Sequence, residues 1–122
     1  MITSILAFYP CTHLQETQLF YTQVIGLQQV FSSDTVRIFA SPKGYIGFVD
    51  YKDGQIAKPH LCISFNCPTR EAVDQEYQRL CAMGHTPKNP PSLHPSQPVY
   101  SFFLQDPNGY LVEYEKIEGI TL

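Results

Sequence analysis

The chain contains one order of predicted elements twice, and this internal repeat constrains the fold more than any other feature of the sequence. Each copy begins with an apolar strand, continues with a helix capped by a threonine and stopped by a glycine, and ends with three further strand candidates. The caps, Thr12 and Thr69, are 57 residues apart, and the stop glycines, Gly26 and Gly84, are 58 apart. The strands are expected at 3–9, 27–31, 35–40, 45–51, 60–66, 85–87, 99–105 and 110–116.

Two βαβββ units of this kind predict the fold class. A chain of 122 residues is long enough to bury a core, but neither unit can cover a sheet face alone. We therefore expect the units to pack together as one α+β domain over 1–122, with module one at about 1–51 and module two at about 60–117. The two curved mixed sheets would form a cup, with the helices on the outside.

The stretch Asp106-Pro107-Asn108-Gly109 carries strong turn chemistry, because proline fixes φ and Asn-Gly tolerates positive φ. In the strand that leaves this turn, side chains alternate, so Leu111, Glu113 and Glu115 share one face. A carboxylate beside a leucine on a covered face needs a cation, a metal or a hydrogen-bond donor, or it must hold its proton. The alternative is a solvated face, and the sequence alone leaves both interpretations open.

Composition bears on several classes of function. Hydrophobic residues make up 43% of the chain and charged residues 16%, which argues against disorder. A net charge of −3 without a Lys/Arg cluster gives no electrostatic footprint for nucleic acid. No apolar run reaches the roughly 18–20 residues of a membrane span, and the N-terminus lacks the pattern of a signal peptide. The 4 cysteines lack zinc-site spacing, so we expect reduced thiols and a cytoplasmic protein.

The chain resembles the vicinal oxygen chelate superfamily, which includes glyoxalase I, bleomycin-resistance proteins, fosfomycin-resistance enzymes and extradiol dioxygenases. The resemblance covers nearly the whole chain and is most specific in its last segment. It rests on Leu14 through Phe20-Tyr21, on Val24-Ile25-Gly26-Leu27, on Phe65, on Arg70-Glu71-Ala72-Val73-Asp74 with Gly84, and on Asp106-Pro107-Asn108-Gly109-Tyr110-Leu111-Val112-Glu113.

Metal-using members of this superfamily place up to four ligands in the cup, one on the first and one on the last strand of each unit. The resemblance carries the last of these positions to Glu113. The first-strand position of the second unit falls on His60, or on Cys62 when the following helix is the anchor, and both remain open. In the first unit the positions fall on Leu6 and Phe48, neither of which can bind a metal.

The nearest alternatives in the first unit are Asp50 and His13. A metal, if one is bound, would be a single divalent ion (zinc, nickel, manganese or iron) held by His60 and Glu113. Two ligands opposite an apolar half-cup should bind weakly, because catalytic metal sites usually have three protein ligands.

The resemblance therefore implies a small-molecule-binding protein that holds its ligand in the sheet cup, with an incomplete metal site. The alternative is a metal-dependent lyase, isomerase or dioxygenase that acts on a small substrate with vicinal oxygens, with Glu113 and His60 as catalytic residues. The resemblance also implies a homodimer, whose cup is built from one chain or from two. One parity of each strand is expected to line the cup: Leu6, Phe8, Ile46, Phe48, His60, Cys62, Ser64, Ser101, Phe103, Leu111 and Glu113.

Overall fold

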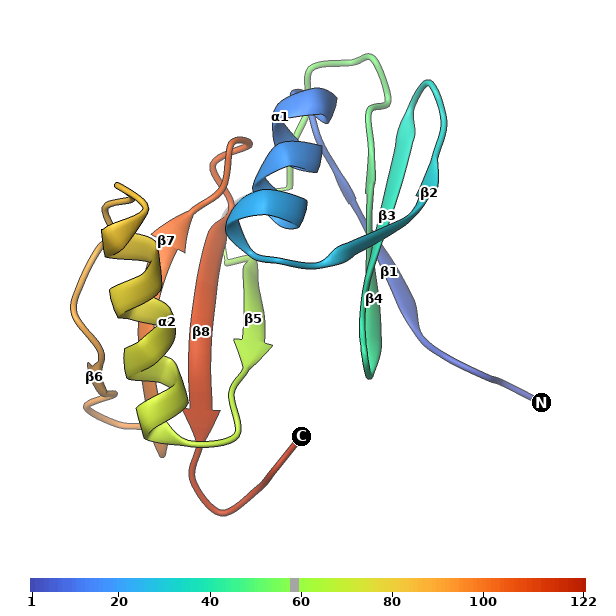
Figure 1. Ribbon diagram of the computed structural model, residues 1–122. Coiled ribbons are helices and arrows are strands. Elements are labelled where there is room, and N and C mark those ends of the chain that lie inside the picture. The colour runs from blue at the N-terminus through green and yellow to red at the C-terminus, as the bar shows by residue number, and fades with distance from the viewer. Residues whose placement is uncertain (58–59) are drawn as a thin grey trace. The chain divides into compact units, whose positions relative to one another are not determined.

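The computed structural model describes residues 1–57 and 60–122, and the chain divides into two compact units, Met1–Pro59 and His60–Leu122 (Figure 1). Each unit has a helical segment and a four-stranded sheet that mixes parallel and antiparallel pairs, in the order βαβββ. The predicted α+β class with two such modules is confirmed. Within the described residues, none of the helices is both long and apolar enough to cross a membrane.

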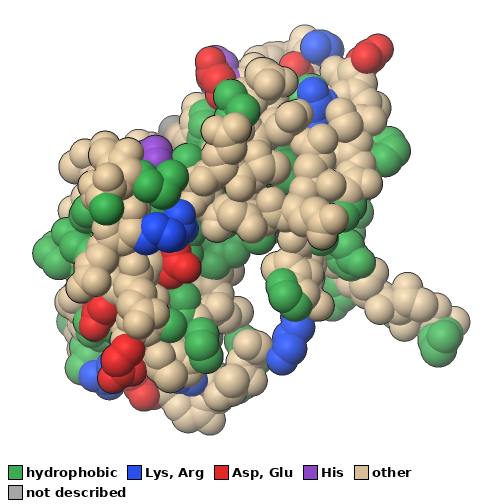
Figure 2. All heavy atoms as spheres, viewed as in Figure 1, with side chains coloured by type: hydrophobic (Ala, Val, Ile, Leu, Met, Phe, Trp, Pro, Cys, Tyr) green, Lys and Arg blue, Asp and Glu red, His purple; other side chains and the backbone are tan. Residues whose placement is uncertain are grey.

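The sheet of the first unit has the strand order β1-β4-β3-β2. The first and last strands of the unit, β1 and β4, pair in parallel, and the remaining pairs are antiparallel. The segment before β1 extends away from this sheet (Figures 1 and 2). Its apolar side chains Met1, Ile2 and Ile5 are exposed. The elements are β1 (Leu6–Pro10), α1 (Leu14–Leu19), the π-helical turn η1 (Phe20–Val24), β2 (Gln28–Ser32), β3 (Val36–Ser41) and β4 (Gly44–Val49).

Aromatic packing against Tyr21 forms the core of the first unit. The ring of Tyr21, which comes from η1, lies 4.7 Å from the ring of Phe48 and 5.7 Å from that of Phe39. All three residues are fully buried. The guanidinium of Arg37 donates from Nε to Gln18 of α1, at 2.6 Å. The helical segment therefore covers the sheet face that carries Phe39, Phe48 and Arg37.

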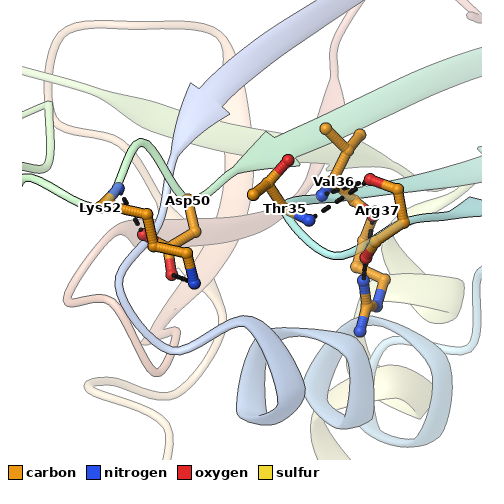
Figure 3. A network of polar contacts seen from close by, with 6 residues as sticks. Thr35, Val36, Arg37, Asp50 and Lys52 are labelled. Carbon is orange, nitrogen blue, oxygen red and sulfur yellow. Dashed lines mark hydrogen bonds and ion pairs between the residues drawn. The ribbon is translucent and has the colours of Figure 1, made fainter.

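A polar network closes one end of this sheet, where β3 begins and β4 ends (Figure 3). The backbone N–H of Asp50 donates to the carbonyl of Thr35 at 2.8 Å, and Ser33 Oγ accepts from the N–H of Val36 at 3.1 Å. The Asp50 carboxylate accepts from the N–H of Lys52 and pairs with its Nζ at 3.3 Å (Figure 3). The backbone hydrogen bond from Lys52 lowers the pKa of Asp50, which is thus engaged in a turn.

The sheet of the second unit has the order β5-β8-β7-β6, and again the first and last strands of the unit, β5 and β8, pair in parallel. The sequence predicted 99–105 correctly. It was wrong about a strand at 85–87, since the short strand in this region lies later, inside the proline-rich loop. The elements are β5 (Cys62–Asn66), α2 (Arg70–Ala82), β6 (Ser92–Leu93), β7 (Val99–Gln105) and β8 (Leu111–Ile117).

Helix α2 covers one face of the second sheet (Figure 1). Tyr77 of α2 meets Phe102 edge to face at 5.3 Å, and Phe102 stacks on Tyr114 at 5.2 Å. Val112 and Leu80 complete this core, and both are fully buried. The apolar alternation in β7 and β8 therefore points Phe102, Val112 and Tyr114 toward the helix, as the sequence predicts.

The two helices begin differently. Thr69 caps α2, because its hydroxyl accepts from the N–H of Ala72 at 3.0 Å. The predicted cap at Thr12 was wrong, since His13 is the N-cap of α1 and makes no side-chain cap bond. The parallel pairing explains the difference. The N–H groups of Cys11 and Cys67 each donate to a carbonyl on the last strand of their unit, so the two cysteines occupy equivalent positions. Two residues further on, the position equivalent to Thr69 is therefore His13, not Thr12.

The turn between β7 and β8 is built around the buried carboxylate of Asp106, which is 5% exposed. Its Oδ1 accepts from the backbone N–H groups of Asn108 and Tyr110, both at 2.8 Å. Gly109 has a φ of 90°, a conformation that glycine adopts without strain. The pairing of Gln105 with Leu111 follows directly from this turn.

Replacing the Asp106 side chain should therefore destabilise the protein. Asp106→Ala leaves two buried N–H groups without their acceptor, and we expect the free energy of unfolding to fall by about 2–3 kcal/mol. Asp106→Asn keeps a carbonyl oxygen at the same place and should lose less than half as much. Urea denaturation of the three proteins measures both changes. Equal losses for Ala and Asn would contradict this role of the carboxylate oxygen.

Candidate functional site

Each sheet has one face covered by its helical segment and an opposite face, called here the helix-free face. In the second unit, strand alternation puts Ser64, Glu113 and Phe103 in one cross-strand row of this face, because Glu113 pairs with both of the others. The next row contains Asn66, Glu115, Ser101 and Ser92, paired in the same way. Cys62 and Leu111 form a third pair. The structure thus brings six predicted site residues to one face: Cys62, Ser64, Ser101, Phe103, Leu111 and Glu113.

The carboxylate of Glu113 is held by side chains from the neighbouring strand. Ser64 Oγ donates to Glu113 Oε1 at 2.7 Å. The thiol of Cys62 lies 3.8 Å from the same oxygen and 3.6 Å from Ser64 Oγ. Glu113 is half-buried, so it has both a fixed orientation and access to solvent.

Glu115 forms a hydrogen bond with Glu113 on the same strand face. Its side chain is 8% exposed. Burial, followed by the charge of Glu113 and the hydrogen bond to it, raises the pKa of Glu115 to about 7. Below that pH Glu115 holds its proton and donates to the Glu113 carboxylate. The sequence placed Glu115 on this face, but its role was missed, because its burial depends on strands that lie next to it only in the fold.

The Cys62 thiol is a poor candidate for a nucleophile. Burial is the main cause that raises its pKa, and the nearby carboxylates Glu113 and Glu115 add to the effect. A thiol with a raised pKa carries little of the thiolate that attacks substrates or binds metals. Cys62 therefore acts in this cluster as a weak donor toward Glu113.

His60 does not lie on the strand face where it was predicted. Strand β5 begins at Cys62, and His60 precedes it as an exposed residue with a φ of 70°. A positive φ is strained for a residue with a side chain and breaks the strand alternation that would align His60 with Ser64. The prediction of a shared strand face for His60, Cys62 and Ser64 thus holds for the last two only.

The first unit has an aromatic ring where the second has the carboxylate. In the parallel pairs, Phe8 faces Gly47 as Ser64 faces Glu113, so Gly47 occupies the position equivalent to Glu113. A Cβ atom on Gly47 would meet the Phe8 ring at 2.6 Å and Leu6 Cδ1 at 3.5 Å. The ring therefore fills the space of the missing side chain, and Leu6 and Phe8 lie on the helix-free face, as predicted.

The prediction for Ile46 and Phe48 was wrong by one residue. Phe48 packs on Tyr21 under the helical segment, and Ile46 has the same strand parity, so both belong to the covered face. Neither can line a ligand site on the helix-free face. The equivalent residues there are Tyr45 and Gly47.

The donor set for a metal ion is incomplete among the described residues. They contain no group of three or more His, Cys, Asp or Glu side chains that could hold a metal. Of the alternatives in the first unit, Asp50 pairs with Lys52, and His13 pairs with Glu16 at 3.4 Å. The residues on this face therefore do not fit the three-ligand site that a catalytic metal usually requires.

The register of β4 can be tested with two phenylalanines of different burial. Phe48→Ala should lower the free energy of unfolding by about 3–5 kcal/mol, because the ring is fully buried. Phe8→Ala should cost only about 1–1.5 kcal/mol, because Phe8 is 48% exposed. Chemical denaturation of both variants and the wild type measures the two losses of unfolding free energy. A larger loss for Phe8→Ala would reverse the assignment of the two faces.

The raised pKa of Glu115 predicts a pH dependence of stability. The folded protein binds this proton more tightly than the unfolded chain, whose carboxyl has a pKa near 4.5. The contribution of Glu115 to stability is therefore largest at low pH and falls as the pH rises from about 4.5 through about 7. Glu115→Gln should remove this fall, measured as the wild-type minus variant difference in unfolding free energy. The exposed Glu71→Gln serves as the control, and a difference that does not change with pH would contradict the assignment.

Comparisons with known proteins agree with this architecture. The sequence profile of the Glyoxalase/Bleomycin resistance protein/Dioxygenase superfamily matches residues 4–114. A comparison with curated proteins finds no match.

Solved structures similar to the chain carry the same fold. A lactoylglutathione lyase from Agrobacterium tumefaciens is 18% identical with a TM-score of 0.80, and 97% of each chain is covered. A glyoxalase/bleomycin resistance protein/dioxygenase from Nocardioides is 20% identical with a TM-score of 0.78, covering 99% of this chain and 87% of that one. A possible glyoxalase from Bacillus cereus is 20% identical with a TM-score of 0.74, covering 93% and 98%. The profile match over most of the sequence shows that the chain belongs to the Glyoxalase/Bleomycin resistance protein/Dioxygenase superfamily.

Proposed function

We propose that this protein binds a small molecule on the helix-free face of its second sheet, with the Glu113 carboxylate as the group that holds the ligand. The observation that carries the proposal is the 2.7 Å hydrogen bond from Ser64 to Glu113, which orients a half-buried carboxylate on the sheet face opposite α2. Ser64, Glu115 and the weak Cys62 donor supply three hydrogen bonds to it. A carboxylate has about four acceptor sites, so one remains for a ligand.

The surroundings of Glu113 support a ligand site. Phe103 and Leu111 flank it on the same face, and both are half-buried. Sites for small molecules are mostly apolar and contain a few placed polar groups that fix the orientation of the ligand. Membership of a superfamily whose proteins act on small molecules favours the same conclusion.

We infer that the ligand is held without a tightly bound metal. This follows from the donor set, because Glu113 and Cys62 meet on one face without a third ligand grouped with them among the described residues. The alternative is a metal-dependent lyase, isomerase or dioxygenase acting through His60 and Glu113. Homodimer formation and a cytoplasmic location stay predictions.

Metal and ligand titrations separate these functions. Zinc, nickel, manganese and iron(II), added to protein purified without chelator, should bind no more tightly than the millimolar range. In an NMR screen of small molecules, signal shifts should cluster at Ser64, Phe103 and Glu113. Glu113→Gln should weaken those ligands by about tenfold to a hundredfold, because a hydrogen bond to a charged group is lost.

Glu71→Gln, an exposed carboxylate in the first turn of α2, is the matched control and should leave the ligand affinity unchanged. Micromolar metal binding that Glu113→Gln abolishes would replace this proposal with the metal-dependent enzyme. Ligand shifts confined to other parts of the chain would also overturn it.

A further inference from the structure

We propose that the ligand of this face is a flat organic cation, such as an amidinium, a guanidinium or a protonated aromatic amine, whose charge meets Glu113 and whose ring lies on Phe103. The inference rests on the proposed function, because it names the class of ligand for the same site. Two features of the face carry it, the adjacency of charge and ring and the sign of the charges, and a nearby hydroxyl is compatible with it.

The charge and the ring are direct neighbours. Phe103 pairs with Glu113 in the antiparallel ladder of β7 and β8, and residues directly opposite each other have Cβ atoms about 4.5–5.5 Å apart. The Phe103 ring is half-buried and, among the described aromatic residues, pairs with no other ring. A planar cation can donate one N–H to the remaining acceptor site of the carboxylate and lie on the face of the ring at the same time.

A hydroxyl in the next row is available to a polar group on the ligand. Ser101 is 4% exposed and pairs with Glu115 in the ladder. Within the part of the chain that the structure describes, no side chain or backbone group is hydrogen-bonded to its hydroxyl. Among the described residues, Gln29 Oε1 is the buried side-chain polar atom without a partner, so the oxygen of Ser101 still meets solvent, and a polar group of a bound molecule can take the place of water there.

The ionisable strand residues of this face are acidic. Glu113 and Glu115 lie on it, while the strand positions around them are Cys62, Ser64, Asn66, Ser101, Phe103 and Leu111. Lys116 has the opposite strand parity, and its Nζ binds the carbonyl of Ile120. Lys88, whose backbone joins the edge of β7 at Phe103, is exposed. A carboxylate or phosphate ligand would therefore meet like charge, whereas a cation would meet its complement.

Three probes of one shape test the charge. Benzamidinium, benzamide and benzoate carry the same ring with a positive, zero and negative charge. They are titrated against the full chain at neutral pH, with a chelator present, and followed by amide NMR signals. Benzamidinium should bind saturably, with shifts at Ser64, Ser101, Phe103 and Glu113. Benzamide should bind at least tenfold more weakly, and benzoate should not bind.

Two variants separate the contribution of the Glu113 charge to binding from that of the Phe103 ring. Glu113→Gln should reduce benzamidinium affinity at least tenfold and leave benzamide unchanged, whereas Phe103→Leu should weaken both. Added salt should weaken benzamidinium only. Glu71→Gln is again the control, and a dispersed amide spectrum for each variant shows that it folds.

The outcomes distinguish this inference from the proposed function. Benzamide or benzoate binding at these residues as tightly as benzamidinium would overturn the cation class and leave the ligand site in place. The same holds if other small molecules bind here and benzamidinium does not. If no small molecule shifts these signals, both proposals are wrong.

Discussion

The carboxylate of Asp106 fixes the register on which the chemistry of the second unit depends. It binds the N–H groups of Asn108 and Tyr110, so β8 leaves the turn with Leu111 opposite Gln105. Because side chains alternate across a strand, a slip of one residue would exchange Glu113 with the core residues Val112 and Tyr114. That exchange would bury a carboxylate against α2 and expose the core side chains that pack under the helix. A short polar turn therefore decides which side chains the sheet offers to a ligand.

The two units use equivalent positions of the same fold in opposite ways. In the first, a glycine at the central position lets the Phe8 ring lie against the backbone of Gly47, and the face is apolar. In the second, Ser64 and Glu113 occupy the equivalent places and bind each other. The repeated fold thus has an apolar face in the first unit and a face with polar side chains in the second. Of these equivalent strand positions, only those of the second unit carry side chains that form hydrogen bonds with each other.

Much of the fold and part of the candidate site could be predicted from the sequence, and the predictions that were wrong have physical causes. The strand 99–105 follows from a short run of mostly apolar and aromatic residues before the Asp106 turn. The parity of β8 follows from alternation, because Val112 and Tyr114 alternate with Glu113 and Glu115. In β4 both parities are apolar or aromatic, so the pattern could not tell which face the helix covers. The assignment of Phe48 to the site failed for this reason.

The start of each helix shows a second limit of the pattern. Thr12 and Thr69 are equally good caps by residue type. In the first unit, however, the cap position lies one residue after Thr12, so His13 is the N-cap of α1. His60 shows a third limit, since a positive φ just before β5 removed it from the strand face. Neither event leaves a signal in residue type alone.

The pair of carboxylates on β8 explains how one strand face can carry two acidic side chains, remain stable and still present a carboxylate to solvent. Two ionised carboxylates on one strand face would repel each other, and Glu115 is buried, so ionising it is costly. A proton on Glu115 removes the second charge and supplies a hydrogen bond to Glu113. Ser64 adds another donor to the same group. Glu113 is the more exposed carboxylate of the pair, and it pairs with Phe103 across the ladder.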